Sequence, residues 1–152
     1  MESIVISDTS CLIVLDKIGY LHLLELMYGQ VVVTPTILAE FGRKLPDWIT
    51  IISPSNDTII KLLEETIDPG EASSIALALE MDNALVILDD LLARKVALQL
   101  GLTITGTLGI IANAKRRGII PSAKLLFELI KATDFRIPNS LLSSILKELG
   151  EE

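Results

Sequence analysis

The chain has 152 residues, of which 50% are hydrophobic and 22% are charged, so the composition excludes an intrinsically disordered protein. The length favours a single domain over residues 1–152, large enough to bury a core without disulfide bonds. Thirteen basic and twenty acidic residues give a net charge of -7. That charge excludes general affinity for nucleic acid, but not a nuclease that meets phosphate through a bound cation.

Short strands and short helices alternate along the first half of the chain. The first strand begins at Ile4, where three branched aliphatic residues in a row are typical of a strand buried on both faces. Asp8 follows this strand, and Ser10 is the expected N-cap of the next helix; Thr34 and Pro35 are expected to open a later one. The expected helices cover 11–18, 36–44 and 58–66, with a short one that runs through Met27, and further strands cover 31–33 and 48–52.

The second half of the chain repeats this alternation. Asp68-Pro69-Gly70 breaks the chain before Glu71, where a new helix is expected to begin. The expected elements are a helix over 71–81, a strand over 84–88, a helix over 91–100, a strand over 102–105 and a helix over 108–117. Strands and helices that alternate with short connections predict an α/β protein with a parallel sheet covered by helices on both faces.

The last part of the chain, residues 119–152, is predicted to be a helical extension. Two amphipathic helices are expected over 122–132 and 139–149. The connection between them contains Phe135, Arg136, Ile137 and Pro138. We expect the two helices to pack as a pair, either on the sheet or on a second subunit.

The sequence carries no mark of export or of membrane insertion. Its apolar stretches are shorter than the roughly 18 residues that a membrane span needs, and Glu2 stands where a signal peptide carries a basic residue. The single cysteine, Cys11, lies among apolar residues and is expected to be a buried thiol, which suits a reducing compartment. We therefore expect a soluble, cytoplasmic protein without a membrane partner.

Acidic side chains stand where the expected elements begin or end. They are Asp8, Glu40, Glu71, Asp89 and Asp90. Because strand ends of one kind share one edge of a parallel sheet, where open α/β sheets bind ligands, we expect these carboxylates to converge. Two carboxylates about 4 Å apart repel by about 4 kcal/mol at an effective dielectric constant of about 20, so such a group collects a cation or retains protons. Oxygen ligands without clustered His or Cys favour Mg²⁺ or Mn²⁺ over zinc.

Each acid also has a simpler interpretation. An acid at the start of a helix complements the helix dipole, and Glu71, directly after Pro69-Gly70, could do only that. His22 lies among leucines and is interpreted as a surface or packing residue rather than as a general base. Proton removal would then fall to a metal-bound water or to one of the carboxylates.

Several segments together carry a resemblance to a known family. They are V-I-S-D-T-S-C-L-I-V-L, T-P-T-I-L-A-E-F, P-G-E-A-S-S-I-A-L-A and V-I-L-D-D. In this order and spacing they resemble the PIN-domain family, and the later segment G-T-L-G-I-I-A-N-A-K-R-R-G-I-I-P resembles one prokaryotic branch of it. The resemblance covers nearly the whole chain. It implies a three-layer α/β/α fold with a parallel sheet in the strand order 3-2-1-4-5, a metal-dependent nuclease site, and frequently a role as the toxin of a toxin-antitoxin pair.

The resemblance also implies which residues form the site. Asp8, Glu40 and the pair Asp89-Asp90 match the first, second and final acids of the family, and Asp90 fits the usual spacing better than Asp89. Glu71 stands where most members have Asp, and its extra methylene moves the carboxylate outward by about 1.5 Å. This difference leaves open how many metal ions the site holds.

Hydroxyl and basic residues are the remaining candidates for the site. Thr9 and Ser10 match the hydroxyl positions that follow the first acid of the family. Arg94, Lys115 and Arg116 belong to two basic clusters that could line a path for a single-stranded backbone. Both clusters have simpler interpretations. Arg94 lies four residues after Asp90 and could pair with it, whereas the other cluster ends a helix, where cations offset the dipole.

These features together predict a Mg²⁺- or Mn²⁺-dependent endoribonuclease with Asp8, Glu40, Glu71 and Asp90 as catalytic residues. The resemblance implies that it is the toxin of a type II toxin-antitoxin pair. The expected partners are an RNA substrate, a second copy of the chain and a cognate antitoxin protein. A receiver-like phosphoacceptor domain has the order of its acids reversed, and a haloacid-dehalogenase phosphatase needs an acid where Ser10 stands. An inactive, dimeric, protein-binding PIN-like module stays open, because Glu71 departs from the family pattern.

Overall fold

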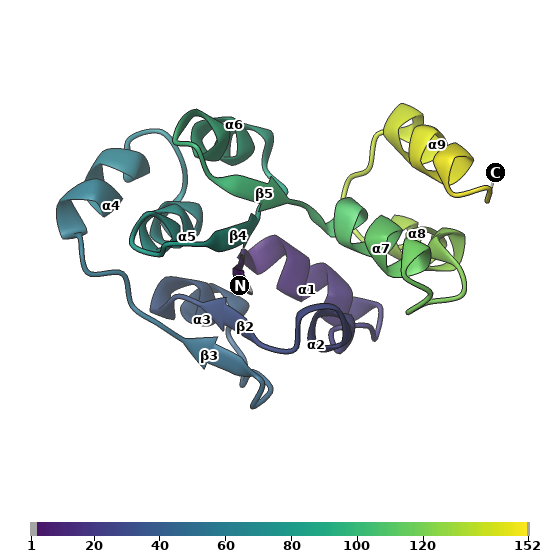
Figure 1. Cartoon of the computed structure of the whole chain (residues 1–152), viewed down its shortest axis with the longest axis horizontal. Helices are drawn as coiled ribbons and strands as arrows, with labels where there is room; N and C mark the ends of the chain where they lie inside the picture. The colour runs from purple at the N-terminus through teal and green to yellow at the C-terminus, as the bar shows by residue number, and fades with distance from the viewer. Residues whose placement is uncertain (1–2, 152) are drawn as a thin grey trace.

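The protein is described by a computed structural model over residues 3–151, and its centre is one parallel β-sheet (Figure 1). The strands are β1 (Ile4–Ser7), β2 (Val31–Val33), β3 (Ile49–Ile51), β4 (Ala84–Ile87) and β5 (Thr103–Thr105). They pair in the order β3-β2-β1-β4-β5, and each neighbouring pair is parallel. This order and the all-parallel pairing confirm the predicted α/β sheet.

Helices cover both faces of the sheet. They are α1 (Thr9–Lys17), α2 (Leu23–Tyr28), α3 (Pro35–Phe41), α4 (Asp57–Glu64), α5 (Pro69–Leu79), α6 (Leu91–Gln99), α7 (Thr107–Arg116), α8 (Ala123–Lys131) and α9 (Asn139–Glu148). The larger hydrophobic core, on one face, contains side chains of six helices: α1, α2, α3, α7, α8 and α9. The smaller core, on the other face, contains side chains of α5 and α6, with α4 at its margin. The fold therefore has the three α/β/α layers that were predicted.

The strands divide their side chains between the two cores. Val5 of β1 faces the larger core, and the next residue, Ile6, faces the smaller one. In β4, Val86 and Ile87 alternate in the same way. Successive side chains of a strand point to opposite faces, so an apolar run such as Ile4–Ser7 suits a strand that is buried on both sides.

Helix starts differ from the predictions because the capping residues lie one or two positions earlier. Asp8, rather than Ser10, is the N-cap of α1, since its carboxylate accepts a hydrogen bond from the amide of Cys11. Asp68 caps α5 in the same way, so this helix begins at Pro69 instead of Glu71. At the other end, α3 stops at Phe41, before the predicted 44, because Gly42 has a φ of 76°. Smaller shifts of one or two residues affect most of the other elements.

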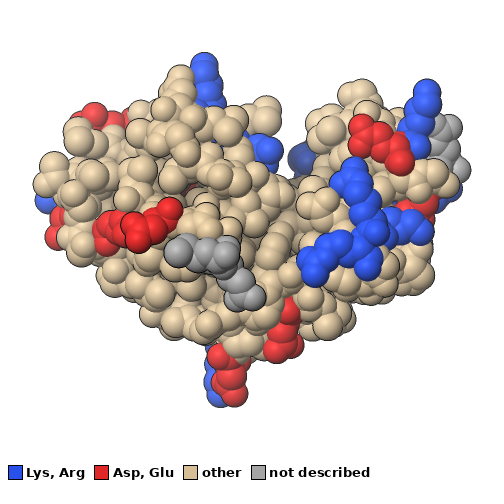
Figure 2. All heavy atoms as spheres, viewed as in Figure 1, with Lys and Arg blue, Asp and Glu red and all other residues tan. Residues whose placement is uncertain are grey.

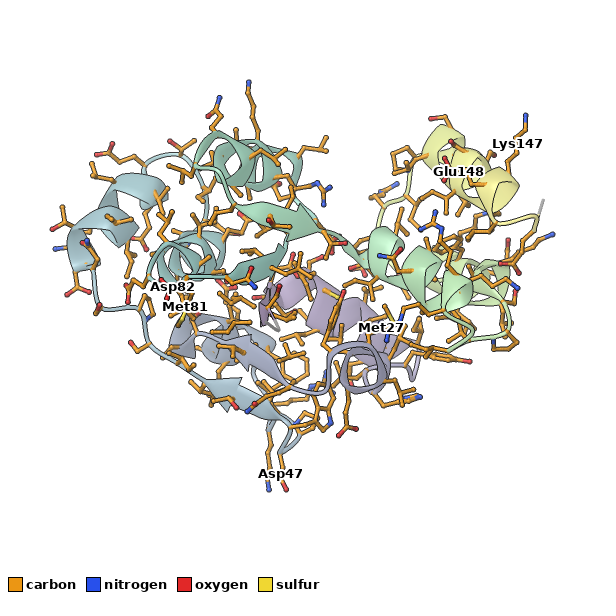
Figure 3. The ribbon with its side chains drawn as sticks, viewed as in Figure 1. Met27, Asp47, Met81, Asp82, Lys147 and Glu148 are labelled. Carbon is orange, nitrogen blue, oxygen red and sulfur yellow. The ribbon has the colours of Figure 1, made fainter. Side chains whose placement is uncertain are left out.

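The C-terminal helices α8 and α9 pack on α7 and complete the larger core. Phe127 and Leu142 are buried in it, together with residues of α1. Arg116 forms an ion pair with Glu148 of α9 at 3.3 Å, and Arg117 donates a hydrogen bond to the carbonyl of Met27 at 3.2 Å. Figure 3 labels the two partner residues, Glu148 and Met27. Figure 2 shows that Lys and Arg side chains gather over this end of the molecule on the face in view. Among residues 3–151, no helix is long and apolar enough to cross a membrane.

Candidate active site

A cavity of about 370 Å³ lies beyond the carboxyl ends of β1 and β4. Its lining residues are Asp8, Thr9, Ser10, Ile37, Glu40, Asp68, Glu71, Asp89, Asp90, Phe135 and Arg136. Every acid singled out in the sequence lines it, although these acids come from four separate stretches of the chain. The parallel sheet produces this convergence, since β1 and β4 are neighbours and end at the same edge.

Asp8 lies at the floor of the cavity, where it joins two strand ends. Its side chain is nearly buried, with 3% of its surface exposed. One carboxylate oxygen accepts the amide of Cys11 at 2.9 Å, and the other accepts the amide of Asp89 at 3.0 Å. Burial raises the pKa of Asp8 well above its ordinary value, and the charges of Asp89 and Glu71 raise it further. A cation would relieve these penalties, and each oxygen retains acceptor capacity for one.

The adjacent acids Asp89 and Asp90 have different partners. Both oxygens of Asp89 bind Thr107, one through its amide at 2.8 Å and one through its hydroxyl at 2.6 Å. Asp90 caps α6 through Oδ2, which accepts the amide of Ala93 at 3.0 Å. Asp89 therefore fastens the end of β4 to the start of α7, whereas Asp90 uses one oxygen for its cap. This difference supports the choice of Asp90 as the better candidate ligand.

Glu40 reaches the cavity across the first turn of α5. Its Oε1 accepts a hydrogen bond from the hydroxyl of Thr9 at 2.5 Å, so one predicted hydroxyl residue orients a predicted acid. A β-carbon placed on Gly70 would lie 2.8 Å from the Cδ atom of Glu40, which is closer than real side chains approach. Glycine at position 70 therefore allows Glu40 to lie against the helix start beside Glu71.

We expect Gly70→Ala to displace Glu40 with little loss of stability. Alanine favours a helix by up to about 1 kcal/mol over glycine, which offsets the movement of a flexible side chain. If Glu40 serves the chemistry, activity should fall by about tenfold or more, because small misplacements of a functional group have large kinetic effects. Gly109→Ala is the matched control, since Gly109 lies in α7, its β-carbon would meet Thr105 of β5, and neither residue lines the cavity. RNA cleavage rates give the activity of both variants, and urea unfolding curves give their stability. Equal activity in the two variants would contradict the role of Glu40.

Glu71 is the carboxylate whose protonation changes near neutral pH. Partial burial raises its pKa to about 7, and the charges of Asp68 and Asp90 contribute. Asp68 lines the cavity and caps α5 by accepting the amide of Glu71 at 2.9 Å. Asp68 is not predicted as a site residue from the sequence, because the Asp-Pro-Gly motif indicates a break in the chain as strongly as it indicates a cap.

The donors around the cavity fit a hard divalent cation by their chemistry. They are carboxylate and hydroxyl oxygens, without a lining His or Cys, and such sets suit Mg²⁺ or Mn²⁺. Within residues 3–151, no three acidic, His or Cys side chains already stand at metal-binding positions. The acids of the cavity instead accept hydrogen bonds from protein amides and hydroxyls, or are too far apart to share one ion. The cation would therefore have to draw the flexible members, Glu40 and Glu71, inward.

The basic residues predicted to guide a substrate are placed elsewhere. Arg94 donates to the carbonyl of Leu88 at 2.8 Å instead of pairing with Asp90. Lys115 donates to the carbonyl of Pro121 at 2.8 Å, and Arg116 pairs with the C-terminal helix α9. None of these three residues lines the cavity. The basic side chain that does line it is that of Arg136. In the sequence, Arg136 and its neighbour Phe135 stand in the connection between two expected helices, and no periodicity distinguishes them.

Comparison with protein families gives one result that covers nearly the whole chain. A family profile described as PIN domain matches residues 4–151. The chain belongs to the PIN-domain family. This PIN domain accordingly has a nuclease-type fold, in a family that typically uses divalent metals. Searches of the curated proteins and of the solved structures gave no significant match.

Proposed function

We propose that this PIN domain is a Mg²⁺- or Mn²⁺-dependent endoribonuclease. The observation that carries the proposal is the convergence of Asp8, Glu40, Glu71 and Asp90 on one cavity beyond the strand ends. Two of these carboxylates are held at a cost in free energy, since burial and the charges of neighbouring acids raise the pKa of Asp8 and of Glu71. A site that serves only stability would not retain such a group of like charges.

The same four acids would hold the cation, with Asp89, Thr9 and Ser10 in support. A divalent cation bound there supplies Lewis-acid stabilisation of the charge that develops on a phosphodiester and makes water a better nucleophile. Asp8 contributes a fixed position, since both its oxygens bind backbone amides. Thr9 orients Glu40 through its hydroxyl.

Glu71 is the candidate proton acceptor of this site. Its carboxylate lines the cavity and is partly exposed, so it can reach an attacking water and take its proton. Water then adds to phosphorus, one ester P–O bond breaks, and the alcohol that leaves takes up a proton. No His lines the cavity, and His22 stacks on Tyr20 with ring centres 5.7 Å apart.

The direct test is cleavage of single-stranded RNA by the purified protein. We expect endonucleolytic products with Mn²⁺ or Mg²⁺ and none with EDTA. A matched reaction with single-stranded DNA of the same sequence tests the choice of RNA. Intact RNA at saturating metal would contradict the proposed activity and favour a binding module without catalysis.

A role as the toxin of a toxin-antitoxin pair is the biological form of this proposal. An uncontrolled endoribonuclease destroys cellular RNA, so expression in bacteria should arrest growth, and a cognate antitoxin protein should reverse the arrest. Asp8→Asn is the control, because it keeps the size of the side chain and removes its charge. Unimpaired growth at high expression of the wild-type protein would contradict the toxin role. We also propose a homodimer, which the molar mass in solution tests.

A further inference from the structure

The connection between α8 and α9 forms one wall of the acidic cavity. Phe135 and Arg136 line the cavity together with the acids, although they follow Asp90 by more than forty residues. The C-terminal helices therefore do more than complete the core. They bring an aromatic ring and a cation to a site that is otherwise lined by acids, hydroxyl residues and one isoleucine.

Several contacts fix this connection in place. The hydroxyl of Thr133 donates to the carbonyl of Ile130 at 2.6 Å and accepts the amide of Phe135 at 3.1 Å. Asp134 forms an ion pair with Lys17 of α1 at 3.0 Å, and Phe135 packs against the larger core. Asp8 caps the start of the same helix α1, so the connection contacts the helix whose first turn lies at the site. Arg136 is thus presented to the cavity by an ordered segment.

Arg136 is available for a ligand. It is exposed, and it takes part in none of the ion pairs formed within residues 3–151. A guanidinium that served to neutralise the site would stand within ion-pair distance of a carboxylate, and Arg136 does not. Its planar set of donors matches a phosphate group.

We propose that Arg136 binds a backbone phosphate of single-stranded RNA at the mouth of the acidic cavity. This assignment rests on the proposed function for the identity of the ligand. The acids repel the negatively charged RNA backbone wherever a bound metal ion does not neutralise them. A basic contact beside the acids is therefore needed to bind the RNA. Phe135 is a positioning residue, because its packing sets where Arg136 stands.

The test measures binding separately from cleavage. The probe is a short, fluorescent, single-stranded phosphorothioate RNA of random sequence, followed by anisotropy in Mn²⁺ at several NaCl concentrations. Arg136→Gln should raise the Kd by about tenfold, the size of a charge-assisted contact. It should also reduce the slope of log K against log salt by about 0.7, the value for one contact to a single strand. Arg136→Lys should restore the slope and only part of the affinity.

Lys61→Gln is the matched control. It removes one positive charge from an exposed position on α4 that lines none of the described cavities, and it should leave Kd and slope unchanged. Any of three results would overturn the assignment: the slope is unchanged in Arg136→Gln, Lys61→Gln changes Kd and slope as much as Arg136→Gln does, or the wild-type protein does not bind the probe. Loss of binding in Arg136→Gln supports it even if the wild-type protein leaves RNA intact, and that second result would overturn the proposed activity alone.

Discussion

Asp8→Asn should abolish RNA cleavage and raise the Kd for Mn²⁺ by about tenfold or more, equivalent to at least about 1.4 kcal/mol of binding free energy. Asp8 is the most buried acid of the cavity and the one whose position both strand ends determine. Asparagine retains one oxygen for the amide of Cys11 and lacks the negative charge that a hard cation requires. Calorimetric titration of Mn²⁺ and the rate of cleavage measure the two effects.

The variant also changes a structural contact, so its folding needs its own control. The side chain of asparagine has one acceptor oxygen and cannot replace both oxygens of Asp8, which accept the amides of Cys11 and Asp89. The lost hydrogen bond lowers the free energy of unfolding, whereas removal of the charge repulsion raises it. Asp47→Asn makes the same chemical change at a residue that points away from the molecule (Figure 3). Mn²⁺ affinity that is equal in Asp8→Asn and Asp47→Asn, with both proteins folded, would contradict a metal site at Asp8.

Glu71→Gln should stabilise the metal-free protein at pH 8 by clearly more than at pH 5. The folded-state pKa of Glu71 is about 7 against an ordinary value of 4.5, so the folded protein binds this proton more tightly than the unfolded chain does. Between these two values the folded state holds more protons, and stability falls as the pH rises. Above pH 7 the loss is complete. Glutamine is neutral throughout and avoids it.

The expected gain at pH 8 is about 1 kcal/mol, because Glu71 is partly exposed and solvent screens much of the repulsion. The position in the first turn of α5 also offsets part of it, since a charged glutamate there interacts favourably with the helix dipole. Urea unfolding at both pH values gives the difference. Wild-type stability that stays level or rises relative to Glu71→Gln between pH 5 and pH 8 would contradict the raised pKa.

Saturating Mn²⁺ should make the wild-type protein more stable than Glu71→Gln, the reverse of the order expected without metal at pH 8. At a concentration one hundred times its Kd, a ligand that binds only the folded state adds about 2.7 kcal/mol of stability. Glu71→Gln has one carboxylate fewer for the cation and should gain less. The same glutamate would then destabilise the empty site and stabilise the filled one, as expected for a group retained for function at the expense of stability.

The order of the strands and helices is predictable from local signals in this chain. The aliphatic runs at Val31–Val33 and Ala84–Ile87 are short enough for buried strands. Between them, prolines open α3 and α5, and a glycine ends α3. The starts of the helices are less predictable. Asp8 and Ser10 are both good N-caps, and the choice depends on which side chain the sheet edge directs at the free amides.

The site is predictable only as far as it follows from strand ends. Asp8, Glu40, Glu71, Asp89 and Asp90 line the cavity as the parallel sheet leads one to expect, whereas their roles stay predictions. Arg136 could not be found in this way. Its place depends on how α8 and α9 fold back onto α1, and that depends on long-range packing and on the ion pair between Lys17 and Asp134.

The most direct measurement is a crystal structure of the protein grown with Mn²⁺, with the ion located by its anomalous scattering. We expect the ion in the cavity, bound by a carboxylate oxygen of Asp8 and by oxygens of Glu40, Glu71 or Asp90 that have moved toward it. Crystals at saturating Mn²⁺ with no anomalous peak among these carboxylates, or with the peak elsewhere on the molecule, would contradict the convergence of the acids on a metal.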